Sequence, residues 1–203
     1  MKGCEVNLIW EGREMCDKIE IYQEKEEFEI EDGVLKKYNG NKKEIIIPDG
    51  VTVIGKEAFF LSEARKIVMP DSVKRLDEYA FDGLVCLRVI KMSRGLEEIG
   101  ENAFCNCRNL GSIKIPNGVK TIGKWAFKGC QKIKYLSVPR SVTSLGIIPL
   151  YDEELFTSLR QEDVVKIKRM LFMSACIELK KIRLPKHLEG SVRSTEFCQV
   201  ILY

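Results

Sequence analysis

The chain has a single histidine, His187, among its 203 residues. Histidine is the commonest general base and metal ligand, so one copy argues against a Ser-His or Cys-His mechanism and against a histidine-rich metal site. Long apolar runs are also missing, because no stretch approaches the roughly 18 residues that a membrane-spanning helix needs. We therefore expect no enzyme, cofactor, metal site or membrane insertion.

The chain also lacks a strong excess of either charge, with 33 basic and 30 acidic residues. Net charge alone therefore does not indicate a nucleic-acid or membrane-surface protein. The N-terminal residues lack the continuous apolar stretch of a signal peptide. We expect a cytoplasmic protein if Met1 is the natural start, and a cell-surface or secreted protein if an export signal has been removed.

Regularly spaced prolines indicate a repeat. Five of them follow a period of 22 or 23 residues: Pro48, Pro70, Pro116, Pro139 and Pro185. At two further positions of this period the proline is replaced, by Ser93 and by Glu162. A period of about 20 to 29 residues is typical of a solenoid, in which each coil stacks only on its neighbours.

Apolar residues recur at fixed distances from the proline position and predict the core. One such column consists of the phenylalanines of a repeated Ala-Phe pair, namely Phe59, Phe81, Phe104 and Phe127. Cys107 and Cys130 occupy another column, in which a different coil has Leu84, so we interpret both as small core residues. Two alternatives are a Cys107–Cys130 disulfide in an exported protein and a metal site at Cys105 and Cys107, although the latter spacing is not that of a zinc motif.

Within one coil, a short strand precedes the proline. In residues 113–115 the two isoleucines should face the core and Lys114 the solvent. Proline ends the strand because it has no N–H to pair, and a turn at 117–118 leads to the opposite wall.

Gly118, Gly123 and Lys124 have the spacing of a phosphate-binding loop. The same residue types recur earlier in the repeat, at Gly50, Gly55 and Lys56. Neither a metal-binding hydroxyl nor a helix signal follows the lysine, so we interpret these residues as repeat positions.

The pattern I-x-I-P-x-x-V-x-x-I-G-x-x-A-F-x-x-C-x-x-L resembles the BspA-like leucine-rich repeat family of bacterial proteins. The match is strong over 45–146 and weaker over 172–185. The resemblance implies an α/β solenoid, a right-handed coil with short parallel strands, that is used for protein binding and has no catalytic residues. The preceding residues resemble the start of such arrays, with a hairpin that turns at Asp32 and Gly33.

We divide the chain into four parts. Residues 1–44 form an N-terminal cap with a hairpin, 45–146 the regular repeats, 147–171 a divergent helical coil, and 172–203 the last repeat and C-terminal cap. In the divergent part the apolar columns fail, and acidic residues early and basic residues late in the segment favour helices. We interpret it as helices that replace one coil; the alternative is a protruding element that meets a partner.

The outward positions two and four residues before each proline form the predicted binding surface. Its members are Ile46, Lys66, Val68, Val89, Lys91, Lys114, Tyr135, Lys181 and Arg183. Strands about 4.8 Å apart would place Lys91 beside Lys114, a repulsion of about 1 kcal/mol in water. Our first hypothesis is a non-catalytic module that binds a protein on this face, and the second is binding of nucleic acid or another polyanion. The third possibility is an ordinary solvated sheet.

Overall fold

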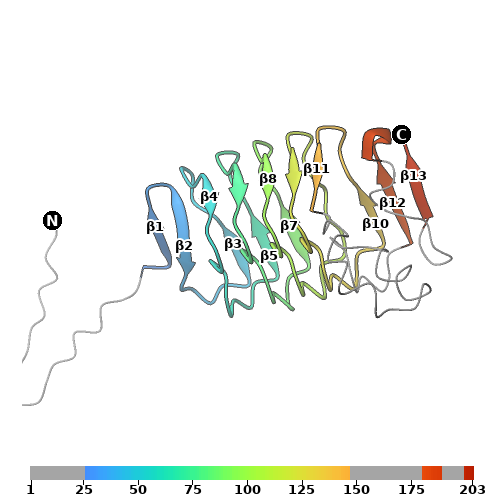
Figure 1. Ribbon diagram of the computed structural model, residues 1–203. Coiled ribbons are helices and arrows are strands. Elements are labelled where there is room, and N and C mark those ends of the chain that lie inside the picture. The colour runs from blue at the N-terminus through green and yellow to red at the C-terminus, as the bar shows by residue number, and fades with distance from the viewer. Residues whose placement is uncertain (1–25, 147–179, 189–198) are drawn as a thin grey trace, which may run out of the picture.

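The computed structural model describes residues 26–146, 180–188 and 199–203, which form a stack of coils with two walls (Figure 1). One wall, which we call the continuous wall, is a seven-stranded sheet. Its strands, in spatial order, are β1 (Phe28–Glu31), β2 (Val34–Tyr38), β4 (Val53–Ile54), β6 (Arg75–Leu76), β8 (Glu98–Ile99), β9 (Thr121–Ile122) and β11 (Ser144–Leu145).

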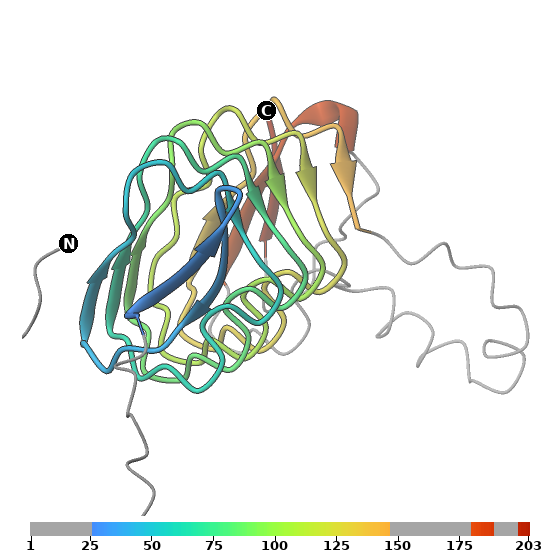
Figure 2. The same ribbon diagram turned by 90° about the vertical axis from the view of Figure 1, so that its left-hand side faces the viewer.

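The other wall, which we call the split wall, consists of two three-stranded sheets. The first holds β3 (Glu44–Ile46), β5 (Lys66–Val68) and β7 (Val89–Lys91), and the second holds β10 (Tyr135–Ser137), β12 (Lys181–Leu184) and β13 (Gln199–Leu202). Figure 2 looks along the stack and shows the walls on opposite sides of the coil. All pairs are parallel except the β1–β2 hairpin, and on the first sheet of the split wall partners lie one repeat apart, as Ile45, Ile67 and Ile90 do.

The core is a stack of aromatic rings along the axis, as the repeat predicts. Phe59, Phe81, Phe104 and Phe127 are fully buried, with successive ring centroids 5.0, 5.2 and 5.5 Å apart. Tyr38 of the hairpin lies 5.5 Å from the Phe59 ring and so covers the N-terminal end of the stack. Each coil therefore completes its burial only through its neighbours.

The predicted N-terminal hairpin is confirmed. It turns at Asp32 and Gly33, whose φ angles of 49° and 74° are both positive, as a tight hairpin turn of two residues requires.

The expected α/β class is corrected to a β-solenoid. The described residues contain no α-helix and a single 3₁₀ turn, η1 (Lys186–Leu188). The absence of α-helix is explained by residues with positive φ, because left-handed residues four positions apart interrupt any right-handed helix. They recur in two columns, the first of Glu57, Tyr79, Asn102 and Trp125 and the second of Leu61, Gly83, Asn106 and Gly129. No described helix could span a membrane.

The sequence predicts a divergent coil between Pro139 and Pro185, but this coil adds no strand to the split wall between β10 and β12. β10 pairs directly with β12, with Tyr135 opposite Lys181, so no strand lies between them. His187, which is exposed, also contacts the earlier coil through Nε2, 2.6 Å from the carbonyl oxygen of Val142. The predicted helices of 147–171 lie outside the described residues.

The cysteines of the apolar column are core thiols, as predicted. Cys107 and Cys130 are fully buried thiols that form no disulfide, and each Sγ donates to a carbonyl oxygen of the preceding coil, Phe81 or Phe104, at 3.1 Å. The structure therefore has no disulfide between them. Cys105, which falls outside the predicted core column, is buried as well, and burial beside Asp82 raises the pKa of its thiol to about 11. The described residues contain no cluster of ligands for a metal ion.

Candidate functional site

The residues predicted to bind a partner lie on strands of the split wall, except Lys114, which lies between its two sheets. On the strands, alternation turns these side chains outward while the residue between them enters the core. Ile46, Tyr135 and Val89 expose 75%, 63% and 49% of their surface, which is high for large apolar side chains. The remaining members fall into two groups. Val68 and Lys181 are half-buried, and the other four are exposed: Lys66, Lys91, Lys114 and Arg183.

The parallel register gathers these residues into two groups. On the first sheet, Ile46 lies opposite Val68, which lies opposite Lys91, while Lys66 lies opposite Val89. On the second sheet, Lys181 lies opposite Tyr135, and Arg183 follows two residues later on the same strand. Lys114 lies between the two sheets and belongs to neither.

Charges on the two walls differ in how they are compensated. On the continuous wall and in the turn after β4, three cations have acidic partners: Lys56–Glu78 at 3.2 Å, Arg75–Asp77 at 2.7 Å, and Lys120–Glu97, whereas Lys37 and Lys74 form no ion pair with a described residue. On the split wall, Lys66 is paired with Glu44 at 2.9 Å. The other predicted cations of this wall form no ion pair with a described residue: Lys91, Lys114, Lys181 and Arg183. The small net charge of the chain thus conceals a basic face.

A further row of cations lies along the rim of the split wall, five residues before each proline position. Its members are all exposed: Lys43, Arg65, Arg88, Lys134 and Lys180. Of these, Lys43 pairs with Glu63, and this hydrogen bond lowers the pKa of the Glu63 carboxyl. Our sequence analysis missed this row, although it follows the same period and lies one residue before the column, four residues before each proline position, that forms part of the predicted binding surface.

The split wall is interrupted at residues 111–117, which we call the sheet break. Elsewhere an N–H after the strand donates to the next coil: Ile47 to Val68 at 3.0 Å, Met69 to Lys91 at 2.9 Å, and Val138 to Arg183 at 2.9 Å. Within the described residues, the equivalent bonds from Met92 to Lys114 and from Ile115 to Ser137 are missing. A single β-bridge between Val89 and Ser112 remains, together with a long bond of 3.5 Å from the N–H of Gly111 to the carbonyl oxygen of Arg88. The strand predicted for 113–115 is therefore wrong.

Local sequence explains the break. Gly111 and Ser112 stand where other coils have residues such as Lys43 and Glu44, and glycine weakens strands. Regular pairing would also place Lys114 beside Lys91, as the sequence analysis noted, and like charges directly opposite each other are destabilising. The core pattern persists nevertheless, since Ile113 and Ile115 stay buried.

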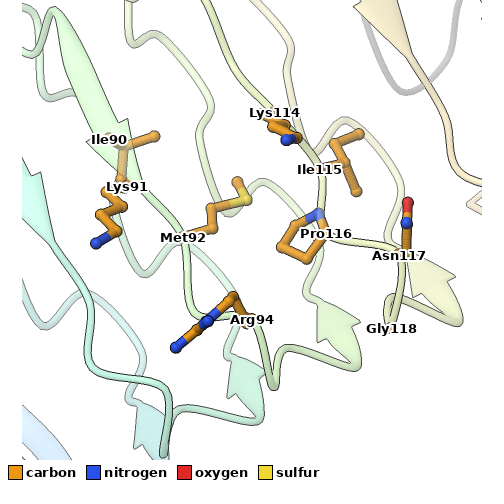
Figure 3. Close-up of a pocket in the computed structure, with 9 residues that line it drawn as sticks. All are labelled: Ile90, Lys91, Met92, Arg94, Lys114, Ile115, Pro116, Asn117 and Gly118. Carbon is orange, nitrogen blue, oxygen red and sulfur yellow. The ribbon is translucent and has the colours of Figure 1, made fainter.

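A hollow lies on each side of the sheet break. The first, of about 520 Å³, lies between β7 and residues 114–118 and has an apolar lining from Ile90, Met92, Ile115 and Pro116. In Figure 3, Met92 reaches toward the far side of this hollow, while Lys91 and Arg94 point away from Met92. The second hollow, of about 410 Å³, includes Tyr135, Lys181, Arg183 and Tyr203, and Lys114 lines both.

The cations around the hollows are not equivalent. Arg94 is compensated by Asp71, to which its Nε donates at 2.8 Å, and this bonding lowers the pKa of the Asp71 carboxyl. Arg183 lies with its guanidinium 4.7 Å from the centre of the Tyr203 ring, a cation–π contact. Lys114, which has neither kind of described partner, is therefore the central uncompensated charge of this region.

Comparison with known proteins gives the family. The BspA type leucine rich repeat region matches residues 29–152 in six copies, which is more than half of the chain. The chain belongs to this family. The family predicted from the repeat pattern is thus confirmed, and leucine-rich repeat proteins generally act as interaction modules without catalytic activity.

Solved structures of bacterial leucine-rich repeat proteins share the fold. The T. pallidum leucine-rich repeat protein is 26% identical with a TM-score of 0.59, over 74% of this chain and 63% of that one. A leucine rich cell surface protein of Faecalibacterium prausnitzii is 30% identical with a TM-score of 0.57, over 73% and 34%. The pneumococcal vaccine antigen PcpA, at 20% identity and a TM-score of 0.57, shares the fold alone. The chain thus spans less than two thirds of these proteins. No curated protein matches it.

Proposed function

We propose that this protein is a non-catalytic interaction module that binds a partner protein on the split wall. The observation that carries the proposal is the contrast in charge compensation. Several cations of the continuous wall, such as Lys56 and Lys120, pair with carboxylates of a neighbouring coil, whereas Lys91, Lys114 and Lys181, which lie close to exposed apolar side chains, have no ion-pair partner among the described residues. A partner with carboxylates would supply the missing counter-charges.

Exposed apolar side chains on the same wall support a protein partner. Ile46 and Val68 adjoin each other across β3 and β5, and Tyr135 lies on the second sheet. Tyrosine is among the residues that most often dominate the binding energy of protein interfaces, and burial of Ile46 and Val68 would remove further apolar surface from water. We infer that the partner has an apolar patch bordered by acidic residues.

Binding of a polyanion is the second candidate, and the rim of cations favours it. A polyanion would track the rim from Lys43 to Lys180 and continue onto Lys91 and Lys114. Its affinity should fall steeply between low and physiological salt, because each neutralised phosphate or sulfate releases counterions. An interface anchored on Ile46 and Tyr135 should change much less with salt. If a polyanion still bound the double variant Lys91→Glu/Lys114→Glu, the basic residues of the split wall would be excluded as its binding site.

Site-specific photo-crosslinking tests the proposed function. A photoreactive phenylalanine would replace Tyr135 on the split wall or, as the control, Thr143 beside β11 on the continuous wall, and both variants would be irradiated in a lysate of the source organism. We expect discrete protein adducts from position 135 and none from 143. Equal adducts from both positions, or adducts at 135 that nuclease removes, would contradict a protein-binding split wall.

A further inference from the structure

We propose that the sheet break is a groove for an extended acidic segment of a partner protein that carries one aliphatic side chain. This inference rests on the proposed function and specifies its partner. The aliphatic side chain would enter the hollow between Met92 and Pro116, and flanking carboxylates would approach Lys91 and Lys114.

The hollows follow the sheet break along its length. A third depression, of about 550 Å³, lies at its start and is lined by Arg88, Asn109, Gly111, Lys132 and Lys134. The hollow that holds Met92 reaches Asn117 and Gly118 at the other end. Seven extended residues cover about 20 Å, so the break offers room for a segment of similar length that lies parallel to the strands.

The lining of the first hollow indicates an aliphatic anchor. Its apolar side chains belong to the buried core but are slightly more exposed than their counterparts one coil earlier: Ile90 and Met92 are 7% and 6% exposed, against 0% and 3% for Ile67 and Met69. Among the described residues that line this hollow there is no aromatic ring on which a base could stack, so a nucleic acid gains little there.

The surroundings of the hollow indicate acidic residues on both sides of that anchor. Lys114 lines the hollows on both faces of the break, and Arg88 lines the depression at its start. The N–H groups of Met92 and Ile115, which lack the ladder bonds of their counterparts, can also donate to a peptide or a carboxylate. Apolar burial and charge complementarity thus select the same kind of segment.

Fluorescence anisotropy with synthetic peptides tests the groove. The first probe carries aspartate and glutamate on both sides of a single leucine; the second has serine in place of the leucine; the third is an oligothymidylate. Each is titrated with the wild-type chain, with Lys114→Glu, with Lys114→Gln and with Lys74→Glu. Lys74 is exposed beside β6 on the continuous wall, so its variant is the control for the same change in charge.

We expect the leucine peptide to bind most tightly. Lys114→Glu should weaken it roughly tenfold and Lys114→Gln less, while Lys74→Glu should change it by no more than about twofold. Because Lys114 is exposed and its loss removes a repulsion with Lys91, these variants should not lower the melting temperature below that of the wild type.

Three results would overturn the proposed groove: equal binding of the serine peptide or oligothymidylate, which would indicate a general polyanion surface; an unchanged affinity in Lys114→Glu; or no binding of the leucine peptide. If protein adducts still formed at position 135 in the crosslinking experiment, the proposed function would stand and this inference alone would fail.

Discussion

The two walls of this solenoid are built from one repeat, yet one is a continuous sheet and the other is split. Both walls have buried apolar columns, since Ile113 in the sheet break and Ile122 on the continuous wall of the same coil are both buried. The walls differ in their outward residues. At the sheet break these are Gly111, Ser112 and Lys114, and regular pairing would place Lys114 opposite Lys91 of the preceding coil. The apolar columns therefore determine how coils stack, whereas outward residues determine whether a strand ladder forms.

The walls also differ in the purpose that their charges can serve. Pairs such as Lys120 with Glu97 neutralise each other between neighbouring coils. The unpaired cations of the split wall lie around hollows and exposed apolar side chains instead. A surface whose charges are not compensated internally is suited to a partner.

The largest effect should come from the ring stack that both walls share. Phe104→Ala removes a fully buried ring from between Phe81 and Phe127 and should lower the free energy of unfolding by about 3–5 kcal/mol. Urea denaturation measures it. Phe60→Ala is the control, because that ring is 62% exposed and its loss should change stability by no more than about 0.5 kcal/mol. Similar losses in both variants would contradict the stack as the common spine.

Glycine substitutions should separate the walls next. At Gly123, beside the continuous wall, a Cβ would lie 2.4 Å from the backbone nitrogen of Glu101, so Gly123→Ala should destabilise by about 1–3 kcal/mol. At Gly111, in the sheet break, a Cβ would meet nothing within 4 Å, so Gly111→Ala should cost no stability. Thermal melts of the two variants would refute the contrast if Gly111→Ala lost as much as Gly123→Ala.

Repairing the break should produce a smaller gain. The double variant Gly111→Thr/Ser112→Val supplies two strand formers and should stabilise the chain by about 1 kcal/mol, as seen by urea denaturation. It should also slow hydrogen exchange at Met92 and Ile115 and weaken binding of the leucine peptide. Unchanged exchange at those amides would mean that Gly111 and Ser112 do not cause the break.

The smallest effect should come from charge compensation. Lys120→Ala loses the partner of Glu97, while Lys91→Ala breaks no described ion pair, so only the first should lower the melting temperature, and slightly. The hydrogen bond from Lys120 lowers the pKa of the Glu97 carboxyl. The pair's contribution is therefore fully present above pH 4.5, the usual pKa of this group, and disappears as the pH falls through the lowered value. A difference between the two variants that persists in strong acid would contradict this assignment.

Much of the architecture could be predicted from the sequence because buried columns impose a strict period. The ring stack, the core cysteines and the hairpin turn at Asp32 and Gly33 follow from it. The break could not be predicted, because it depends on a balance between weak strand propensity at Gly111 and repulsion between Lys91 and Lys114. The direct pairing of β10 with β12 was hidden for a different reason, since the spacing of two repeats from Pro139 to Pro185 suggested a coil between them.

Hydrogen exchange at single amides tests the difference between the walls most directly. Met69, Met92, Ile115 and Val138 occupy the same position in successive coils of the split wall, and only Met69 and Val138 donate to the next coil. We predict that the amides of Met92 and Ile115 exchange about tenfold faster than the other two, in keeping with the loss of one hydrogen bond each. Equal protection at all four amides would show that the ladder is unbroken and would contradict the account.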